Sequence, residues 1–135
     1  FRYELPDYGR VGDREVLRKP MVMNNLYASV LSFLRIDTGL ETRQYGFRDA
    51  CSRLVELDET IALPRGYRLA GEPRSEQKAA PAADFEGSLQ QVGNKLVLKQ
   101  KLALKKRIYR AADWEGFRAA VNAYKSFADY LIVKL

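Results

Sequence analysis

The strongest constraint on the fold is an alternation of side chains along residues 95–109. Apolar residues occupy alternate positions through most of this run, and the positions between them are largely basic or small. A period of two places the two sets on opposite faces of a β-strand. We therefore expect one long strand with a wet basic face and a buried face that carries Leu96, Leu98, Leu102, Leu104 and Ile108, interrupted by Gln100 and Lys106.

The segment just upstream repeats this alternation. Phe85, Gly87 and Leu89 alternate with polar residues, and Gly93-Asn94 separates this segment from the long strand. Two alternating runs joined by a short Gly/Asn turn are typical of a β-hairpin.

Residues 54–63 form a second alternating run, with Val55, Leu57, Ile61 and Leu63 on one parity. Pro64-Arg65-Gly66 then provides a turn, and residues 67–70 can begin another short strand. Residues 71–83 are rich in Pro, Ala, Glu and Gln and show no periodicity, so we expect a mobile surface loop there.

The first third of the chain has weaker patterns. Residues 3–5 and 16–23 resemble short strands, and Pro20 favours an edge position for the second. Residues 26–36 are apolar on both parities, so a buried strand and a helix capped by Asn25 both fit. We favour the strand, because Asp37-Thr38-Gly39 resembles a hairpin turn that leads into a further strand over residues 40–47.

A helix is predicted near the end of the chain. Trp114, Phe117, Val121, Tyr124 and Ala128 follow the 3.6-residue repeat, and Asp113 is a suitable N-cap. The apolar residues 131–133 suggest a closing strand. Together these elements predict a mainly β protein: an antiparallel β-sandwich, immunoglobulin-like or related, with one C-terminal α-helix, formed by a single domain over residues 1–135.

Composition limits the chemistry of this domain. It contains no histidine, and Cys51 is its one cysteine. A Cys–His or Ser–His nucleophilic site needs an imidazole base, and zinc sites draw on the same two residue types. We therefore expect no enzyme activity, and we assign no catalytic, cofactor-binding or metal-binding residue. Carboxylate-only and lysine chemistry are not excluded by these counts.

No apolar stretch reaches the length of about 20 residues needed for a membrane span.

Several groups of residues could still form a site, and each has a structural interpretation that we favour. The basic run could follow a phosphate backbone, but a solvated strand face is the simpler reading. The carboxylate pairs could act as a dyad, but caps and exposed acids are commoner. The aromatic residues could stack on a sugar, but their spacing fits core packing. Cys51 is expected to be a passive, buried or half-buried thiol. The basic run comprises Lys99, Lys101, Lys105, Lys106, Arg107 and Arg110; the carboxylate pairs are Asp58 with Glu59 and Asp113 with Glu115; the aromatic residues are Trp114, Tyr109, Phe117, Tyr124 and Tyr130.

A family resemblance rests on short motifs in a fixed order. The run Ile61-Ala62-Leu63-Pro64-Arg65-Gly66-Tyr67 resembles an "I-x-L-P-x-G-Y" element, preceded by Leu17-Arg18-Lys19-Pro20-Met21. Gly93-Asn94-Lys95-Leu96 follows, and then Tyr109, Trp114, Phe117-Arg118 and Tyr130-Leu131-Ile132-Val133. This order resembles the C-terminal β-sandwich domain of bacterial, Bacteroidetes-type transglutaminase-like multidomain proteins. The resemblance is best from about residue 54 to the end, whereas residues 27–48 depart from the pattern.

The resemblance implies an accessory domain of unknown function in a larger exported protein, located in the periplasm, the cell envelope or outside the cell. It implies that any Cys-His-Asp catalysis lies in a core domain outside this chain, so the expected partners are the adjacent domains. A carbohydrate- or peptide-binding module is the alternative, with a glycan or peptide as partner. The formal charge of +6 also prompts a nucleic-acid hypothesis, but no nucleic acid is expected. No cofactor is expected. The ligand, the oligomeric state and the fold of residues 24–48 are left open.

Overall fold

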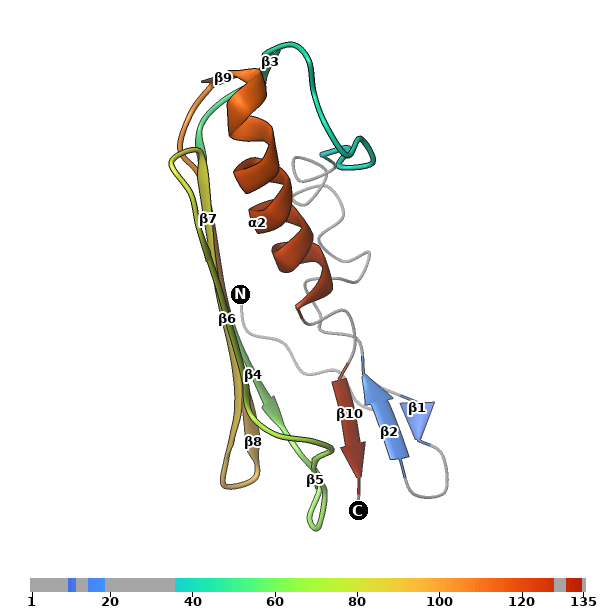
Figure 1. Cartoon of the computed structure of the whole chain (residues 1–135). Helices are drawn as coiled ribbons and strands as arrows, with labels where there is room; N and C mark the ends of the chain where they lie inside the picture. The colour runs from blue at the N-terminus through green and yellow to red at the C-terminus, as the bar shows by residue number, and fades with distance from the viewer. Residues whose placement is uncertain (1–9, 12–14, 19–35, 128–130, 135) are drawn as a thin grey trace.

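The computed structural model describes residues 10–11, 15–18, 36–127 and 131–134. The strand expected at residues 3–5 and most of the segment 26–36 lie outside the described residues, as do residues 19–23 of the strand expected at 16–23. Within the described part, an antiparallel sheet packs against one α-helix, and a smaller sheet lies near the end of that helix (Figure 1).

The main sheet has four strands in the order β4-β8-β7-β6. They are β4 (Arg53–Ala62), β6 (Arg74–Ala79), β7 (Ala83–Val92) and β8 (Lys95–Leu104). Val92 pairs with Lys95 across the Gly93-Asn94 turn, where Gly93 has a positive φ of 60°. The predicted hairpin and the strand predicted over residues 54–63 are confirmed.

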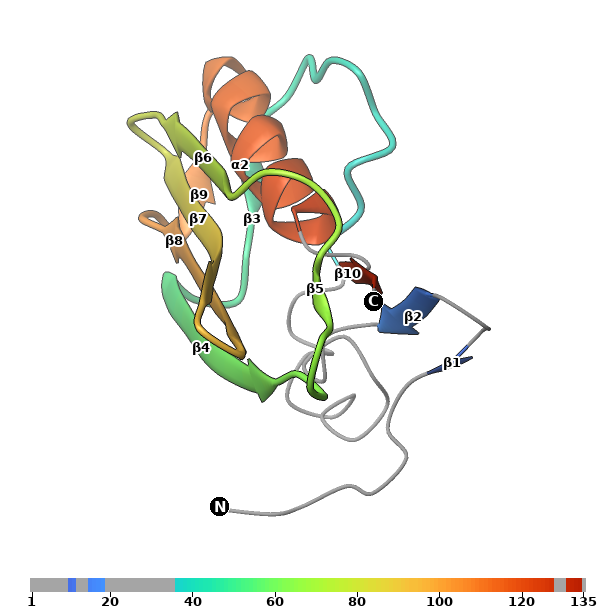
Figure 2. The same ribbon diagram turned by 90° about the horizontal axis from the view of Figure 1, so that it is seen from below.

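Alternation in these strands divides the sheet into an inner and an outer face. The inner face is buried by helix α2 (Trp114–Ser126), which packs across it (Figure 2). The predicted helix is thus confirmed, and it forms part of the core. Full burial of a large apolar side chain contributes about 1.5–3 kcal/mol, so this packing stabilises the fold substantially. The inner face and the helix bury Phe85, Leu89, Leu96, Leu98, Leu102, Leu104, Trp114, Phe117, Val121 and Tyr124.

The smaller sheet brings together segments that lie far apart in the sequence. Its order is β1 (Arg10–Val11), β2 (Glu15–Arg18), β10 (Leu131–Lys134) and β5 (Arg68–Leu69). The predicted short strand after the Pro64-Arg65-Gly66 turn and the closing strand are both confirmed. A mainly β, antiparallel architecture with a C-terminal helix is therefore confirmed, and it is compatible with a β-sandwich.

The long predicted strand over residues 95–109 is broken near its end. Lys105 N–H donates to the Ala82 carbonyl at 3.0 Å, and the chain resumes as β9 (Ile108–Tyr109), paired with β3 (Phe47–Arg48). Because β9 resumes out of phase, Tyr109 is buried and Ile108 is 73% exposed. The prediction that Ile108 is buried was wrong for this reason.

Three other expectations were wrong. Within residues 71–83, Arg74–Ala79 form β6, because an edge strand is held by backbone hydrogen bonds to β7 and needs no apolar period. Of residues 40–47, only Phe47 belongs to a strand. Cys51 is exposed, because it lies in the bend that joins β3 to β4.

Residues 36–43, which we call the strap, run beside α2 without regular secondary structure (Figure 1). Residues Trp114, Arg118, Asn122 and Lys125 share one helix face, because they are spaced by three or four positions. Five hydrogen bonds join their side chains to the strap. Lys125 Nζ donates to Ile36 O at 2.6 Å and to Thr38 Oγ1 at 3.2 Å, Arg118 Nε donates to Thr38 O at 2.9 Å, Thr38 Oγ1 donates to Asn122 Oδ1 at 2.6 Å, and Trp114 Nε1 donates to Leu40 O at 3.0 Å.

Candidate functional site

The basic run lies partly on the outer face of the main sheet, where its lysines face acidic residues across the strands. Lys99 Nζ lies 3.2 Å from Asp58, and Lys101 Nζ lies 3.4 Å from Glu56. Each of these side chains is at least half exposed, and exposed pairs contribute about 0–1 kcal/mol each. The predicted solvated strand face is confirmed for these residues.

A shallow hollow of about 510 Å³ opens on this outer face. Its lining includes Glu56, Asp58, Glu86, Lys99 and Lys101, so acidic and basic groups are interspersed. Ligand pockets are usually concave, mostly apolar and equipped with a few convergent polar groups. This hollow has mutually compensating charges instead, and it does not indicate a particular ligand.

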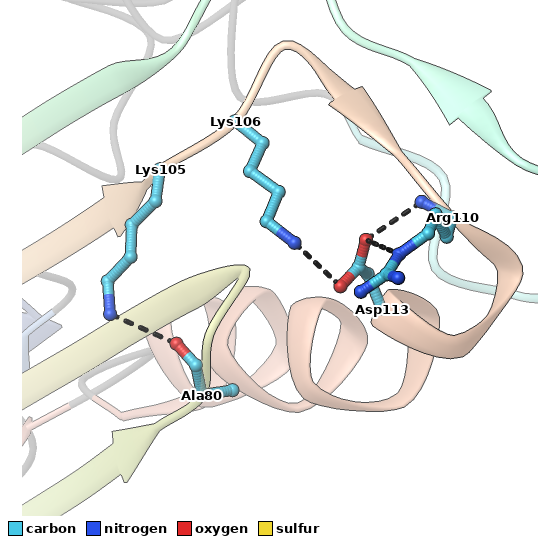
Figure 3. A network of polar contacts seen from close by, with 5 residues as sticks. All are labelled: Ala80, Lys105, Lys106, Arg110 and Asp113. Carbon is cyan, nitrogen blue, oxygen red and sulfur yellow. Dashed lines mark hydrogen bonds and ion pairs between the residues drawn. The ribbon is translucent and has the colours of Figure 1, made fainter.

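The most buried ion pair of the basic run joins Lys106 to Asp113 (Figure 3). Its Oδ1 lies 2.8 Å from Lys106 Nζ, and its Oδ2 accepts a 2.8 Å hydrogen bond from the Arg110 N–H. The Lys106 ammonium, and next the Arg110 N–H, lower the pKa of Asp113 below its ordinary value of 3.8. Asp113 occupies the N-cap position of α2 as predicted, but its carboxylate bonds back to Arg110 across the 3₁₀ turn η4 (Ala111–Asp113).

Lys105 makes a second contact of this kind at the turn between β6 and β7. Its Nζ donates to the Ala80 carbonyl at 3.0 Å (Figure 3) and lies 2.6 Å from Asp84. Asp84 also accepts a hydrogen bond from Ala80 N–H at 3.1 Å. The Lys105 hydrogen bond is the main cause that lowers the pKa of Asp84. Both carboxylates therefore act as fixed acceptors that hold turns.

The two carboxylate pairs singled out in the sequence do not act as pairs. Asp58 lies opposite Lys99 on the outer face, whereas Glu59 lies opposite the buried Leu98. Asp113 is engaged by Lys106, and Glu115 is exposed. Asp58 and Glu115 are exposed and Asp113 lies at the helix N-cap, as the structural interpretation predicts, whereas Glu59 is half-buried.

The aromatic residues form a core cluster. Tyr109, Trp114, Phe117 and Tyr124 are all buried, which confirms the core prediction for these four; Tyr130 lies outside the described residues. Phe47 stacks on Tyr109 with ring centroids 4.7 Å apart and meets Trp114 and Phe117 edge to face. The Arg43 guanidinium lies 4.3 Å from the Trp114 ring centroid. Neither Phe47 nor Arg43 stood out in the sequence, because both belong to a segment without periodicity.

A polar pair lies at the edge of this cluster. The Asp49 carboxylate accepts a hydrogen bond from Arg53 Nη2, and both side chains are largely buried. Burial is the main cause that raises the pKa of the neighbouring Tyr109 phenol. No sequence pattern pointed to this pair, because Asp49 and Arg53 flank a bend and lie near β9 only through the β3–β9 pairing.

The Leu63-Pro64-Arg65-Gly66-Tyr67 motif has a structural role. Tyr67 N–H donates to the Pro64 carbonyl at 3.1 Å, and Gly66 has a φ of 91°, as a tight turn requires at this position. Gln91 connects this region to the hairpin, because its Oε1 accepts from Leu69 N–H at 2.7 Å. The adjoining hollow of about 560 Å³ is open and has Tyr67, Arg68 and Asn94 in its lining.

In the part of the chain that the structure describes, no group of three or more His, Cys, Asp and Glu side chains could hold a metal ion. No helix in the described part of the chain is both long and apolar enough to cross a membrane.

Comparison with known proteins identifies the class of this domain. Residues 16–133 match DUF3858, a family of domains of unknown function with a solved structure. The chain belongs to the DUF3858 family. No curated protein matches it.

A solved structure shares the fold. It is that of a candidate protease from Parabacteroides distasonis ATCC 8503, which superposes with a TM-score of 0.72 at 14% sequence identity. The match covers 93% of this chain and 24% of the other. The present chain thus spans about a quarter of the protein it resembles.

Proposed function

We propose that this chain is a non-catalytic accessory domain of an exported transglutaminase-like protein, and that it packs on the catalytic core of that protein and positions it. The observation that carries this proposal is the unequal coverage of the fold match, 93% of this chain against 24% of the candidate protease. A domain that recurs as a minor part of a larger protein is suited to an accessory role. The "L-P-x-G-Y" resemblance supports the transglutaminase-like assignment.

The polar contacts support a non-catalytic role. Asp113, Asp84 and Asp49 each accept hydrogen bonds from neighbouring basic or backbone groups that fix turns and strand ends. A catalytic acid or base instead needs a reacting proton within hydrogen-bond reach. Four of the five aromatic residues that suggested a glycan-binding shelf lie in the described part of the chain, and all four are buried. They therefore give the glycan-binding alternative no support.

The β3–β9 ribbon offers a surface for the neighbouring domain. Ile108 is 73% exposed and lies directly opposite the exposed Arg48 in the register of the ribbon. Buried apolar side chains and arginine are enriched in the centres of protein interfaces. The ion pairs of the outer sheet face, by contrast, are satisfied among themselves. We therefore place the interdomain contact at Ile108 and Arg48.

Ile108→Asp in the full-length parent protein tests this placement. Truncation of a central, hot-spot side chain at an interface costs about 2 kcal/mol or more. The variant should therefore separate the unfolding transition of this domain from that of the core. Lys99→Gln on the outer face is the control and should leave the unfolding profile nearly unchanged, because the ion pair that it removes is exposed. Equal behaviour of the two variants would place the contact elsewhere.

Export is part of the proposal and has its own test. Fractionation of cells that produce the parent protein should recover it from the periplasm, the envelope or the medium. Recovery in the cytoplasmic fraction would contradict this assignment without affecting the interdomain contact.

A further inference from the structure

Strand β6 ends the main sheet, and among the described residues only one of its two edges is paired (Figure 2). That edge pairs with β7 in a continuous register from Arg74 to Ala79. The other edge carries backbone N–H and C=O groups that can pair with a further strand. β6 contains no proline and no bulge that would block such pairing.

The register decides which backbone groups of β6 point to the free edge. Ala80 N–H donates to the Ala83 carbonyl at 3.1 Å, and these two residues continue the register by one position, so they form a hydrogen-bonded pair. Hydrogen-bonded and non-hydrogen-bonded pairs alternate along an antiparallel ladder. The even-numbered residues of β6 therefore bond to β7, and the backbone groups of the odd-numbered residues point away from the sheet. These are Ser75, Gln77 and Ala79, and all three are exposed.

Glu76 and Lys78 place opposite charges on the helix side of β6. They lie opposite Gly87 and Phe85, which are buried on the inner face of the sheet. Their side chains are 35% and 47% exposed, and Glu76 Oε1 lies 3.4 Å from Lys78 Nζ. Like charges directly opposite each other destabilise a strand pair, whereas opposite charges stabilise it. The free edge therefore favours an antiparallel strand that carries the same two charges in the same order.

A second copy of β6 is such a strand. We propose that two copies of the protein associate edge to edge through β6, around a two-fold axis that passes through Gln77. The two Gln77 residues then form a hydrogen-bonded pair, because their backbone groups both point to the free edge. An axis through Ser75 or Ala79 would leave fewer residues of β6 opposite each other.

This register brings the charges together in the favourable order. Glu76 lies opposite Lys78 of the second copy in a non-hydrogen-bonded pair, where side chains approach most closely. The two-fold axis repeats this contact, so two ion pairs join the copies. The two main sheets become one continuous sheet, with both α2 helices on the same face.

Sedimentation of the full-length parent protein over a concentration series measures this association, and we expect a monomer–dimer equilibrium. Gln77→Pro should abolish the dimer, because it removes an N–H that the central pair needs and that β7 does not use. Gln77→Ala keeps this N–H and is the matched control. It should dimerise like the unsubstituted protein.

Charge variants test the register independently, and they keep the test decisive if the proline variant does not fold. Lys78→Glu places two glutamates opposite each other on both sides of the axis, so the dissociation constant of the dimer should rise about tenfold. Combining Lys78→Glu with Glu76→Lys exchanges the two charges and should restore the original constant.

The proposal is overturned if the unsubstituted protein stays monomeric throughout the series, or if Gln77→Pro and Gln77→Ala associate equally. A charge-exchanged double variant that associates as weakly as Lys78→Glu would also overturn it. β6 and the β3–β9 ribbon belong to different sheets, so a negative result here leaves the interdomain contact at Ile108 untouched.

Discussion

Gly116 in helix α2 lies directly against Ala80 in the β6–β7 turn. A methyl group at Gly116 would come within 2.5 Å of the Ala80 Cβ atom, closer than two carbon atoms can approach without movement. This contact fixes how closely the first turns of α2 approach the turn that Lys105 and Asp84 hold.

Gly116→Ala should therefore destabilise the domain, although alanine is the better helix former. The helix preference favours alanine by about 1 kcal/mol, whereas overpacking costs about 1–3 kcal/mol. We expect a net loss of about 1 kcal/mol, measured by denaturant unfolding. Ala80→Gly in the same chain should restore stability, because it removes the opposing methyl group. A single variant more stable than the parent would show that the turn can move aside.

Asp113→Asn should lower the melting temperature near neutral pH. The folded state lowers the pKa of Asp113, so this carboxylate stabilises the fold above its ordinary pKa of 3.8. That contribution is lost as the pH falls below 3.8 through the lower folded-state pKa. The difference between parent and variant should shrink over the same interval in a series of thermal melts. Asp58→Asn, on the exposed outer face, is the control, and an equal effect of both substitutions would argue against a special role for Asp113.

Replacement of Lys99 by methionine should change stability by less than about 0.5 kcal/mol, because its pair with Asp58 is exposed. The small effect should decrease further in high salt, since exposed ion pairs are screened. Denaturant unfolding at two salt concentrations measures both. A loss of more than about 2 kcal/mol would show that the outer face is covered in the folded protein.

Lys125→Met should loosen the strap while leaving the sheet intact. The substitution removes the hydrogen bonds from Nζ to the Ile36 carbonyl and to Thr38 Oγ1. Hydrogen bonds to charged groups contribute about 1.5 kcal/mol or more, so local opening should become roughly tenfold more frequent. Limited proteolysis within residues 36–46 should accelerate accordingly. Unchanged cleavage would mean that Arg118 and Trp114 hold the strap without Lys125.

Much of the main sheet could be predicted from the sequence, because β7 and β8 each bury one face and expose the other. Helix α2 could be predicted for the same reason, from Trp114, Phe117, Val121 and Tyr124. The edge strand β6 could not, because its residues are held by hydrogen bonds to β7 and need no apolar pattern.

The strap and the positions of Asp49, Arg53 and Tyr109 could not be predicted from sequence patterns. The strap is held by side chains of α2, so nothing within residues 36–43 repeats with the period of a helix or strand. The position of the polar group depends on where β9 resumes after the break. For the same reason, an alternation extended from β8 through the break predicts a buried Ile108, whereas this side chain is exposed. The solvated positions of Lys99 and Lys101 could be anticipated from the alternation, whereas the contacts of Lys105 and Lys106 with turns could not, because they depend on the break after β8.

We propose that this domain supports a catalytic core and performs no chemistry of its own. The most direct measurement is the steady-state activity and thermal stability of the parent protein with and without residues 16–133. We predict that the shortened protein keeps its catalytic chemistry but loses stability and part of its rate. Unchanged stability and rate on removal, or complete loss of activity from a single substitution such as Asp113→Asn in a fully folded parent, would contradict the account.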